Sequence, residues 1–462
     1  MSATLEQLLR DAKVELVVAR AEKDPSVIGE IVEYLGSDIR SIRFNAALSL
    51  GELGEKAATS VSKLVDCLED NDWSICREAT RSLGKIGQAS VDAIPNLAKL
   101  LSDQEVTIRK EAAISLGKIG VASDLAVSSL IAALNDSDEE VRTEAARTLG
   151  RMGHGASSSI PRLIDSLKDP AWTVRTAAAQ AIEGIGRGST EAIPMLVHTL
   201  EDNDWRVRYR SINTLSQIGE PAIPAVLEVI NHSDPIVRKG AIEVFGEMRV
   251  TDEKIIAQIA GLLTDKVESV RGKAVDSLRS IGKEAISALI DSYINANTKM
   301  KILIISAIGG IGADATDAIP TLNEILGNPK TSIRDAAASV LGNSGETKIR
   351  AATASALGNI GIPDSSVIRS LAEALSDPMS VVRREAALSL GKLGSDASEA
   401  IPALLEALSD KKPDVRWRAS EALGKVGTSN TDIIPALENM LYDEYDYVSE
   451  AAQEALDLIG GS

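Results

Sequence analysis

The chain has 462 residues, of which 44% are hydrophobic but only 3% aromatic, and its formal net charge is −18. This aliphatic composition is typical of closely packed helices, and the negative charge disfavours nonspecific binding to nucleic acid or anionic membranes. The two cysteines, Cys67 and Cys76, are too few for a disulfide framework and predict a reducing, cytoplasmic setting. Since no uninterrupted apolar run approaches the ~20 residues that span a bilayer, we expect no membrane contact.

Residues 1–22 come first and predict one amphipathic helix that caps an array. From there the pattern V/I-R-x-x-A-x-x-x-L-G-x-I-G recurs to the end of the chain. Its arginine position, here called the Arg slot, serves as position zero of each repeat. The slot occurs fourteen times, mostly at intervals of 33 residues. It holds Arg43, Cys76, Arg109, Arg142, Arg175, Arg208, Arg238, Arg271, Lys301, Arg334, Arg350, Arg383, Arg416 and Ser449.

Each repeat predicts two helices. In the second, such as "VRREAALSLGKLG" (382–394), apolar residues at positions −1, +3, +4, +7 and +10 form one helical face. Glycine at +8 allows a neighbouring helix to approach, and glycine at +11 predicts a left-handed stop. The first helix, such as "EAIPALLEAL" (399–408), has an early proline. Nine turns between the two carry an aspartate six residues before the slot: Asp70, Asp103, Asp136, Asp169, Asp202, Asp265, Asp377, Asp410 and Asp443.

Two short helices bury too little surface alone, so the repeats are expected to stack as a solenoid. Ankyrin and tetratricopeptide repeats share the period, but their T-P-L-H and Trp/Tyr patterns are absent. The chain resembles the short HEAT-like repeats of the phycobilisome-lyase type. The resemblance implies an all-α fold, an α-α superhelix of about fourteen helix-pair repeats. It also implies an Asp–Arg ladder along the stack and a concave surface lined by the second helices.

The repeat breaks at one place. Arg334 and Arg350 lie only 16 residues apart, which leaves room for one helix between the slots. The preceding stretch, 294–312, is also irregular. We therefore predict a cap helix and first array over 1–312, a phase-break seam over 313–361, and a second array with its C-terminal cap over 362–462. Neutral deletion and a functional bend both remain open as origins of the seam.

Catalytic motifs are not found in the sequence. The three histidines lie in different repeats, and no His–Glu pair, C-x-x-C, phosphate-binding loop or G-x-S-x-G occurs. We expect no catalytic residue, no metal site and no cofactor, and a chain that is not an enzyme. The cysteines are expected to be small buried hydrophobes, with a reactive thiol as the alternative.

Positions −3, −2, +1, +2, +5 and +9 of the second helix are predicted to face away from the core. Seven of the twelve aromatic residues, including every tryptophan, fall there. Exposed tryptophan, tyrosine and arginine are enriched at binding hot spots. The predicted partner-binding residues are Phe44, Trp73, Arg77, Arg81, Lys85, Lys118, Arg151, Trp172, Trp205, Tyr209, Trp417 and Tyr447. Two alternatives stay open: the tryptophans fold over their own helix starts, and the basic residues pair with surface glutamates.

These patterns predict a non-catalytic scaffold or assembly factor that binds a protein or peptide on its second helices. An acidic ligand would suit the basic residues of repeats two to four. The resemblance implies one alternative, a bilin-lyase-type enzyme or enzyme subunit. The basic stripe in repeats two to four allows another, RNA binding, which the interspersed glutamates disfavour. The sequence leaves the oligomeric state open.

Overall fold

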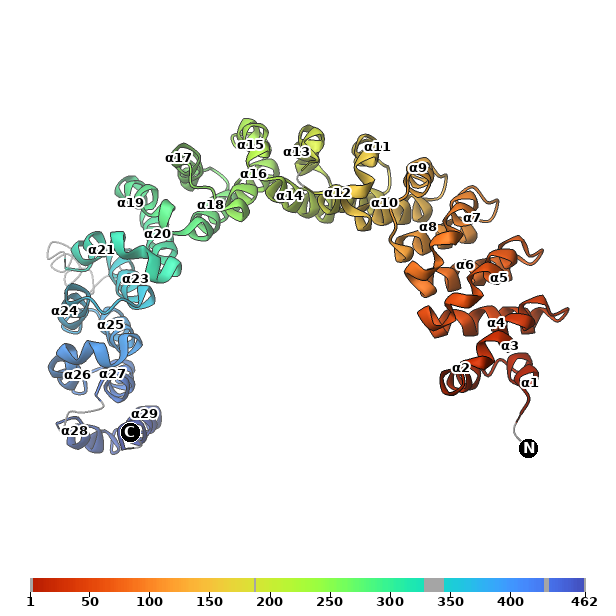
Figure 1. Ribbon diagram of the computed structural model, residues 1–462. Helices are drawn as coiled ribbons and strands as arrows, with labels where there is room; N and C mark the ends of the chain where they lie inside the picture. The colour runs from red at the N-terminus through yellow and green to blue at the C-terminus, as the bar shows by residue number, and fades with distance from the viewer. Residues whose placement is uncertain (1–2, 187, 328–344, 428–431, 461–462) are drawn as a thin grey trace. The chain divides into compact units, whose positions relative to one another are not determined.

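The computed structural model describes residues 3–186, 188–327, 345–427 and 432–460. The secondary-structure elements within these ranges are α-helices and short 3-10 helices (Figure 1). The predicted all-α solenoid is confirmed. The chain divides into two compact units, Met1–Val244 and Phe245–Ser462, with the division inside helix α16. The predicted boundaries at 312 and 361 stay predictions.

The N-terminal unit begins with two helices where we predicted one. These are α1 (Leu5–Arg10) and α2 (Val14–Lys23), and Ala12 between them has a left-handed φ of +54°. First and second helices then alternate: α3 (Ser26–Glu33) and α4 (Arg40–Leu53), α5 (Val61–Asp66) and α6 (Trp73–Ile86), α7 (Ile94–Leu100) and α8 (Val106–Ile119), α9 (Asp124–Ala133) and α10 (Glu139–Arg151), α11 (Ile160–Ser166) and α12 (Trp172–Ile185), α13 (Ile193–His198) and α14 (Trp205–Ile218), α15 (Ile223–Val229) and α16 (Pro235–Met248).

The C-terminal unit continues the alternation with α17 (Glu253–Gly261) and α18 (Glu268–Ile281), α19 (Ile286–Asn295) and α20 (Thr298–Ile311), α21 (Ile319–Leu326) and α23 (Gly345–Ile360), α24 (Ser365–Ala374) and α25 (Ser380–Leu393), α26 (Ile401–Ala407) and α27 (Pro413–Val426), α28 (Ile433–Met440) and α29 (Asp446–Gly460). Within each unit the first helices form one layer and the second helices another (Figure 1).

Short 3-10 helices connect or extend these elements. They are η1 (Tyr34–Gly36), η2 (Gly54–Ser60), η3 (Cys67–Glu69), η4 (Gly87–Ala93), η5 (Gly153–Ser159), η6 (Thr190–Ala192), η7 (Thr199–Glu201), η8 (Glu220–Ala222), η9 (Leu262–Thr264), η10 (Gly282–Ala285), η11 (Gly312–Ala318) and η12 (Gly394–Ala400). The glycine at +11 ends most second helices with positive φ, but the predicted left-handed stop occurs at Gly120 and not at most of the others. Gly87, for example, has ψ of −138°, so its backbone lies outside the left-handed helical region in one that only glycine adopts readily.

The predicted core positions of the second helix are confirmed. In α12 they are Val174, Ala178, Ala179, Ile182 and Ile185, and all five are buried. Adjacent second helices also touch each other closely, because glycine at +8 meets a small residue at +6 of the next repeat. The Ser115 hydroxyl, for example, donates a hydrogen bond of 2.8 Å to the Thr80 carbonyl of α6.

This close approach predicts the effect of one methyl group. A Cβ on Gly84 would lie 2.5 Å from Ser115 Oγ and 2.9 Å from its Cα, so the two helices would have to separate. We expect Gly84→Ala to lower the free energy of unfolding by about 1–3 kcal/mol in a denaturant titration. Gly29 in α3 is the matched control, since a Cβ there meets nothing within 4 Å. Gly29→Ala should leave stability unchanged or raise it; equal losses in both variants would contradict the packing argument.

Position +2 does not face away from the core as we predicted. Asn45, Glu78 and Glu111 occupy it, and all three are buried. Position +2 lies one turn before +6, on the same side of the helix, and +6 packs on the preceding second helix. The close spacing of the second helices therefore covers this side.

At the predicted phase break, the structure shows which second helix packs against α20. A Cβ on Gly309 of α20 would lie 2.7 Å from Ala356 Cα of α23, and Gly358 of α23 meets Ser389 of α25 in the same way. Helix α23 therefore takes the place of the next second helix after α20, with α21 as its first helix. The helix predicted around Arg334 lies outside the described residues.

One described stretch, Thr298–Leu326, is long and apolar enough by length and composition to cross a membrane. In the structure it is two helices of neighbouring repeats, the second helix α20 and the following first helix α21. They are separated by η11, where Gly312 has φ of +75°. A core helix pair passes the same test, so the stretch gives only weak evidence of a membrane segment.

Candidate protein-binding face

The slot arginines and turn aspartates form the predicted ladder. Arg109 donates two hydrogen bonds to the Asp136 carboxylate, from Nε at 2.7 Å and from Nη2 at 2.9 Å, and a third to the Asp103 carbonyl at 2.9 Å. Six further pairs repeat this two-pronged bond: Arg43–Asp70, Arg142–Asp169, Arg175–Asp202, Arg350–Asp377, Arg383–Asp410 and Arg416–Asp443. These carboxylates join neighbouring repeats, and the hydrogen bonds account for them without a catalytic role.

Cys76 stands where the ladder would need an arginine. Its Sγ donates to the Leu68 carbonyl at 3.1 Å, and both cysteines are buried and unbonded to each other. Burial raises the pKa of the Cys67 thiol and of the Cys76 thiol to about 11. This supports the prediction that they are structural rather than reactive.

The buried thiols give a simple test. At about pH 8 only a trace of either thiol is ionised, and the thiolate is the reactive form. We expect Ellman's reagent to label the native protein slowly and to label both cysteines rapidly in urea. Rapid labelling of the native chain, abolished by Cys76→Ser, would instead identify a reactive thiol.

The densest aromatic site lies at the starts of α12 and α14. Trp172 and Trp205 are the first residues of these helices and are 40% and 61% exposed. The Arg206 guanidinium carbon lies 4.2 Å from the Trp172 ring centroid and 5.5 Å from that of Trp205. Tyr209, 51% exposed, lies one turn beyond Trp205. We call these four residues the α12–α14 cluster; the structure brings three predicted residues together through an arginine that we did not predict.

A second aromatic site lies in the C-terminal unit. Trp417 of α27 and Tyr447 of α29 meet edge to face with centroids 5.7 Å apart, and Tyr445 lies 5.9 Å from Tyr447. Arg418 lies over the Trp417 ring at 3.7 Å. The Tyr447 hydroxyl donates to Asp414, and this contact holds the ring in place.

The other predicted residues do not join either site. Trp73 is exposed and has Arg77 over its ring at 5.1 Å, whereas Phe44 is half-buried with no ring contact to a described residue. Both interpretations of the sequence hold in part, because Trp73, Trp172 and Trp205 each lie at the start of a helix and are still exposed to solvent.

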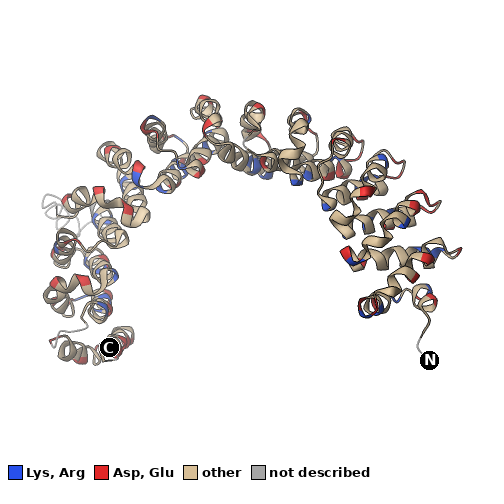
Figure 2. Ribbon diagram, viewed as in Figure 1, with Lys and Arg blue, Asp and Glu red and all other residues tan. Residues whose placement is uncertain are grey.

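Two of the five predicted basic residues in repeats two to four are paired with glutamates. Arg81 contacts Glu111 at 3.2 Å and Glu78 at 3.5 Å, and Lys85 contacts Glu52 at 2.6 Å. Charges of both signs alternate along the second helices of the N-terminal unit (Figure 2). Lys118 and Arg151 differ, because neither forms an ion pair with a described residue. The alternative of solvated surface pairs therefore holds for Arg81 and Lys85, and the stripe is less positive than its arginines and lysines suggest.

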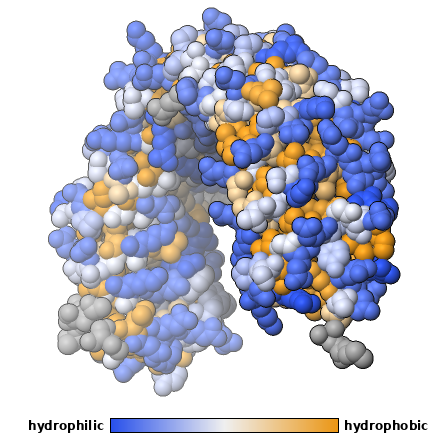
Figure 3. Space-filling model, turned by 45° about the vertical axis from the view of Figure 1, so that its right-hand side comes forward, coloured by the Kyte–Doolittle hydropathy of each residue, from blue (hydrophilic) through white to orange (hydrophobic). Residues whose placement is uncertain are grey.

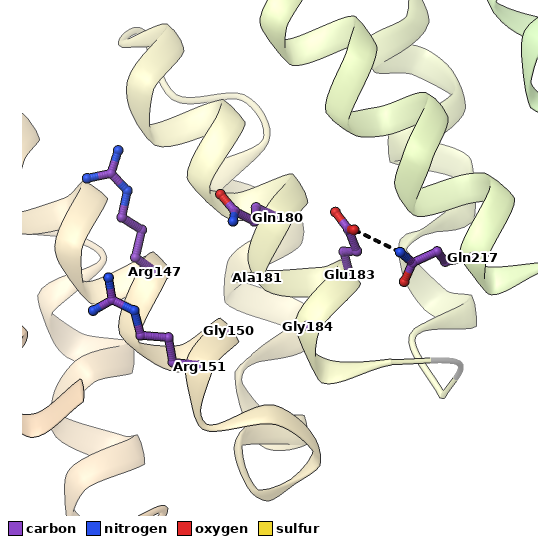
Figure 4. Close-up of a pocket in the computed structure, with 8 residues that line it drawn as sticks. All are labelled: Arg147, Gly150, Arg151, Gln180, Ala181, Glu183, Gly184 and Gln217. Atoms are coloured by element: carbon purple, nitrogen blue, oxygen red, sulfur yellow. Dashed lines mark hydrogen bonds between the residues drawn. The ribbon is translucent and has the colours of Figure 1, made fainter. Parts of the chain in front are cut away.

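A pocket of about 380 Å³ opens between the second helices α10, α12 and α14 (Figure 4). Its polar lining comes from Arg147, Arg151, Gln180, Glu183 and Gln217. The Gln217 side-chain amide donates to Glu183 Oε1 at 2.9 Å, and Glu183 Oε2 is buried without a hydrogen-bond partner. No group of three or more metal-ligating side chains occurs among the described residues.

Comparison with known proteins identifies the repeat. The model of HEAT repeats matches residues 2–84, 61–127, 121–183, 160–244, 223–299, 343–399 and 395–457. The chain belongs to the HEAT repeat family. The match is to HEAT repeats in general and does not extend to the lyase subtype. No curated protein matches the chain.

Solved HEAT solenoids share this fold at low identity. Kap95p bound to RanGDP aligns at 15% identity over 96% of this chain and 67% of that one, with a TM-score of 0.55. Importin beta in an ammonium sulfate condition aligns at 14% over 95% and 67%, with a TM-score of 0.53. Yeast importin beta aligns at 14% over 100% and 70%, with a TM-score of 0.51. Likeness at this level establishes the HEAT fold alone.

Two functional candidates were absent from the sequence prediction. Arg206 occupies position −2, which we assigned to the binding face, and its place directly after Trp205 in the sequence was the signal that could have identified it. Tyr445 lies one residue outside the chosen positions and becomes part of the C-terminal aromatic site only through the turn before α29.

Proposed function

We propose that this HEAT chain is a non-catalytic scaffold that binds a protein partner on the second-helix face of its N-terminal unit. The observation that carries the proposal is the α12–α14 cluster, where Trp172 and Trp205 are exposed yet fixed by one guanidinium. Rings that are already ordered lose little freedom on binding, which is what a hot spot requires.

Two further observations support a protein ligand. Hydrophobic patches lie between hydrophilic residues on the surface seen in Figure 3, as on proteins that bind partners. The solved structure of Kap95p with RanGDP is a HEAT solenoid with a protein partner, although the likeness is one of fold. The pairing of Arg81 and Lys85 with glutamates disfavours RNA. We place the chain in the cytoplasm, where two unpaired thiols are compatible with the redox conditions.

Affinity capture tests the proposal. Tagged wild-type chain and the double variant Trp172→Ala/Trp205→Ala are exposed to extract of the native organism, and bound proteins are quantified by mass spectrometry. A defined set of proteins should be retained by the wild type and lost from the double variant. Tyr442→Ala is the control, because Tyr442 is 89% exposed, lies in the turn between α28 and α29, and belongs to neither aromatic site. Equal capture by the wild type and the double variant would refute the assignment of the cluster.

A further inference from the structure

Buried polar atoms without partners concentrate on the second helices. Eight such side-chain atoms occur in the part of the chain that the structure describes, and three of them lie on α12: Thr173 Oγ1, Thr176 Oγ1 and Glu183 Oε2. Nearly all buried polar atoms in folded proteins have hydrogen-bond partners. Helix α12, which begins at the exposed Trp172, carries three of these eight exceptions.

Two of these residues, Thr176 and Glu183, lie on the side of α12 that begins at Trp172. Trp172, Thr176, Gln180 and Glu183 are separated by four, four and three residues, and this spacing aligns them along a helix. The row from Trp172 to Glu183 extends about 16 Å at 1.5 Å per residue. An extended peptide covers the same length with about five residues and offers a backbone N–H and C=O at each.

The far end of the row is the pocket between α10, α12 and α14. Arg147 and Arg151 lie one turn apart on α10 and line the pocket, and in Figure 4 their side chains extend in the same direction, away from Glu183 and Gln217. Arg147 bonds Glu144 at 2.6 Å, but Arg151 has no ion pair with a described residue. Two like charges at this spacing repel each other, so an anion beside them would be stabilised.

The acidic residue in the pocket wall, Glu183, already has partners within the chain and is not expected to attract a cationic ligand. Glu183 already accepts the Gln217 amide at 2.9 Å and lies 3.9 Å from the Arg210 guanidinium. Its charge is therefore compensated, while that of Arg151 is not. The Oε2 of Glu183 is the atom that lies 3.9 Å from Arg210 Nη1 and is closed to solvent, so Glu183 forms a wall of the pocket rather than a group that binds the ligand.

We propose that α12 and this pocket bind an extended peptide segment of the partner that carries an acidic side chain. An apolar or aromatic side chain rests on Trp172 and Trp205, and a carboxylate four or five residues away lies beside Arg147 and Arg151. This inference rests on the proposed function and adds the conformation and the sequence requirement of the ligand.

Selection from a phage-displayed library of random peptides of about 16 residues tests the inference, using full-length chain as bait. Wild-type chain should enrich peptides with an apolar or aromatic residue and Asp or Glu four or five positions apart. In a synthetic copy of an enriched peptide, Glu→Gln should weaken binding to wild type at least about tenfold. The same change should have no effect on binding to Arg147→Gln/Arg151→Gln, whose melting temperature serves as the folding control.

The outcomes separate the two proposals. Acidic enrichment that persists on the Arg147→Gln/Arg151→Gln bait would overturn the pocket assignment, as would enrichment of basic residues or of no sequence at all. A preferred spacing of about eleven residues would identify a helical ligand and overturn the extended one. If the enriched peptides bind Trp172→Ala/Trp205→Ala as tightly as wild type, the proposed aromatic hot spot fails, whatever the arginines show.

Discussion

Replacing Trp172 and Trp205 together by alanine is expected to weaken partner binding by at least about 2 kcal/mol, roughly thirtyfold in Kd. The melting temperature should remain nearly unchanged. Both rings are substantially exposed, and their described ring contact is to one arginine side chain rather than to the core. Loss of surface atoms away from packed or buried polar groups changes stability little. Isothermal titration with the captured partner and thermal unfolding followed by circular dichroism measure the two quantities.

Tyr442→Ala should leave both quantities unchanged, since this exposed turn residue belongs to neither aromatic site. Arg206→Ala is informative in a different way, because it removes the group between the rings and keeps both tryptophans. If fixed rings matter, it should weaken binding by less than the double variant. Unfolding of the double tryptophan variant would show that the rings are structural packing and would remove the basis of the binding face.

The fold could be predicted because the repeats share one pattern of apolar and small residues at fixed positions. Apolar residues at fixed positions define one buried side of the second helix, and Val174 and Ile182 of α12 lie there as expected. The contact of Gly84 with Ser115 also follows from sequence, since only small residues at both positions allow such an approach. The Arg109–Asp136 bond could be expected only from the resemblance to HEAT families, and the structure confirms it.

The candidate site depended on geometry between repeats, which a pattern within one repeat does not contain. Glu78 and Glu111 seemed to face away from the core, yet the adjacent second helices cover them. The same geometry decides that Arg81 bonds Glu111 and that Arg206 lies between two tryptophans. The seam shows the limit most clearly, because sequence spacing gave no way to choose which helix would follow α20.

Arg109→Ala is expected to lower the free energy of unfolding by about 1–3 kcal/mol at neutral pH. The variant removes two charge-assisted bonds to Asp136 and one to a backbone carbonyl, and it leaves a largely buried carboxylate without its partner. Lys110→Ala is the matched control, one residue away. Lys110 pairs with Glu140 at 2.6 Å on the surface, where an ion pair contributes little. Urea titrations of the wild type and both variants measure the difference.

The loss should depend on pH with a definite sign. Burial raises the pKa of the Asp136 carboxyl. The hydrogen bonds from Arg109 and from the Asp138 backbone N–H, together with the charge of Arg109, lower this pKa by more than burial raises it. The folded pKa therefore lies below its ordinary value. A carboxyl with a lowered folded pKa adds stability above its unfolded pKa of about 4, and this stability disappears as pH falls through the folded pKa. The gap between wild type and Arg109→Ala should therefore be widest near neutral pH and narrow below about pH 4. A gap that stays constant down to acid pH would mean that Arg109 stabilises the stack through its aliphatic stem rather than through its charge.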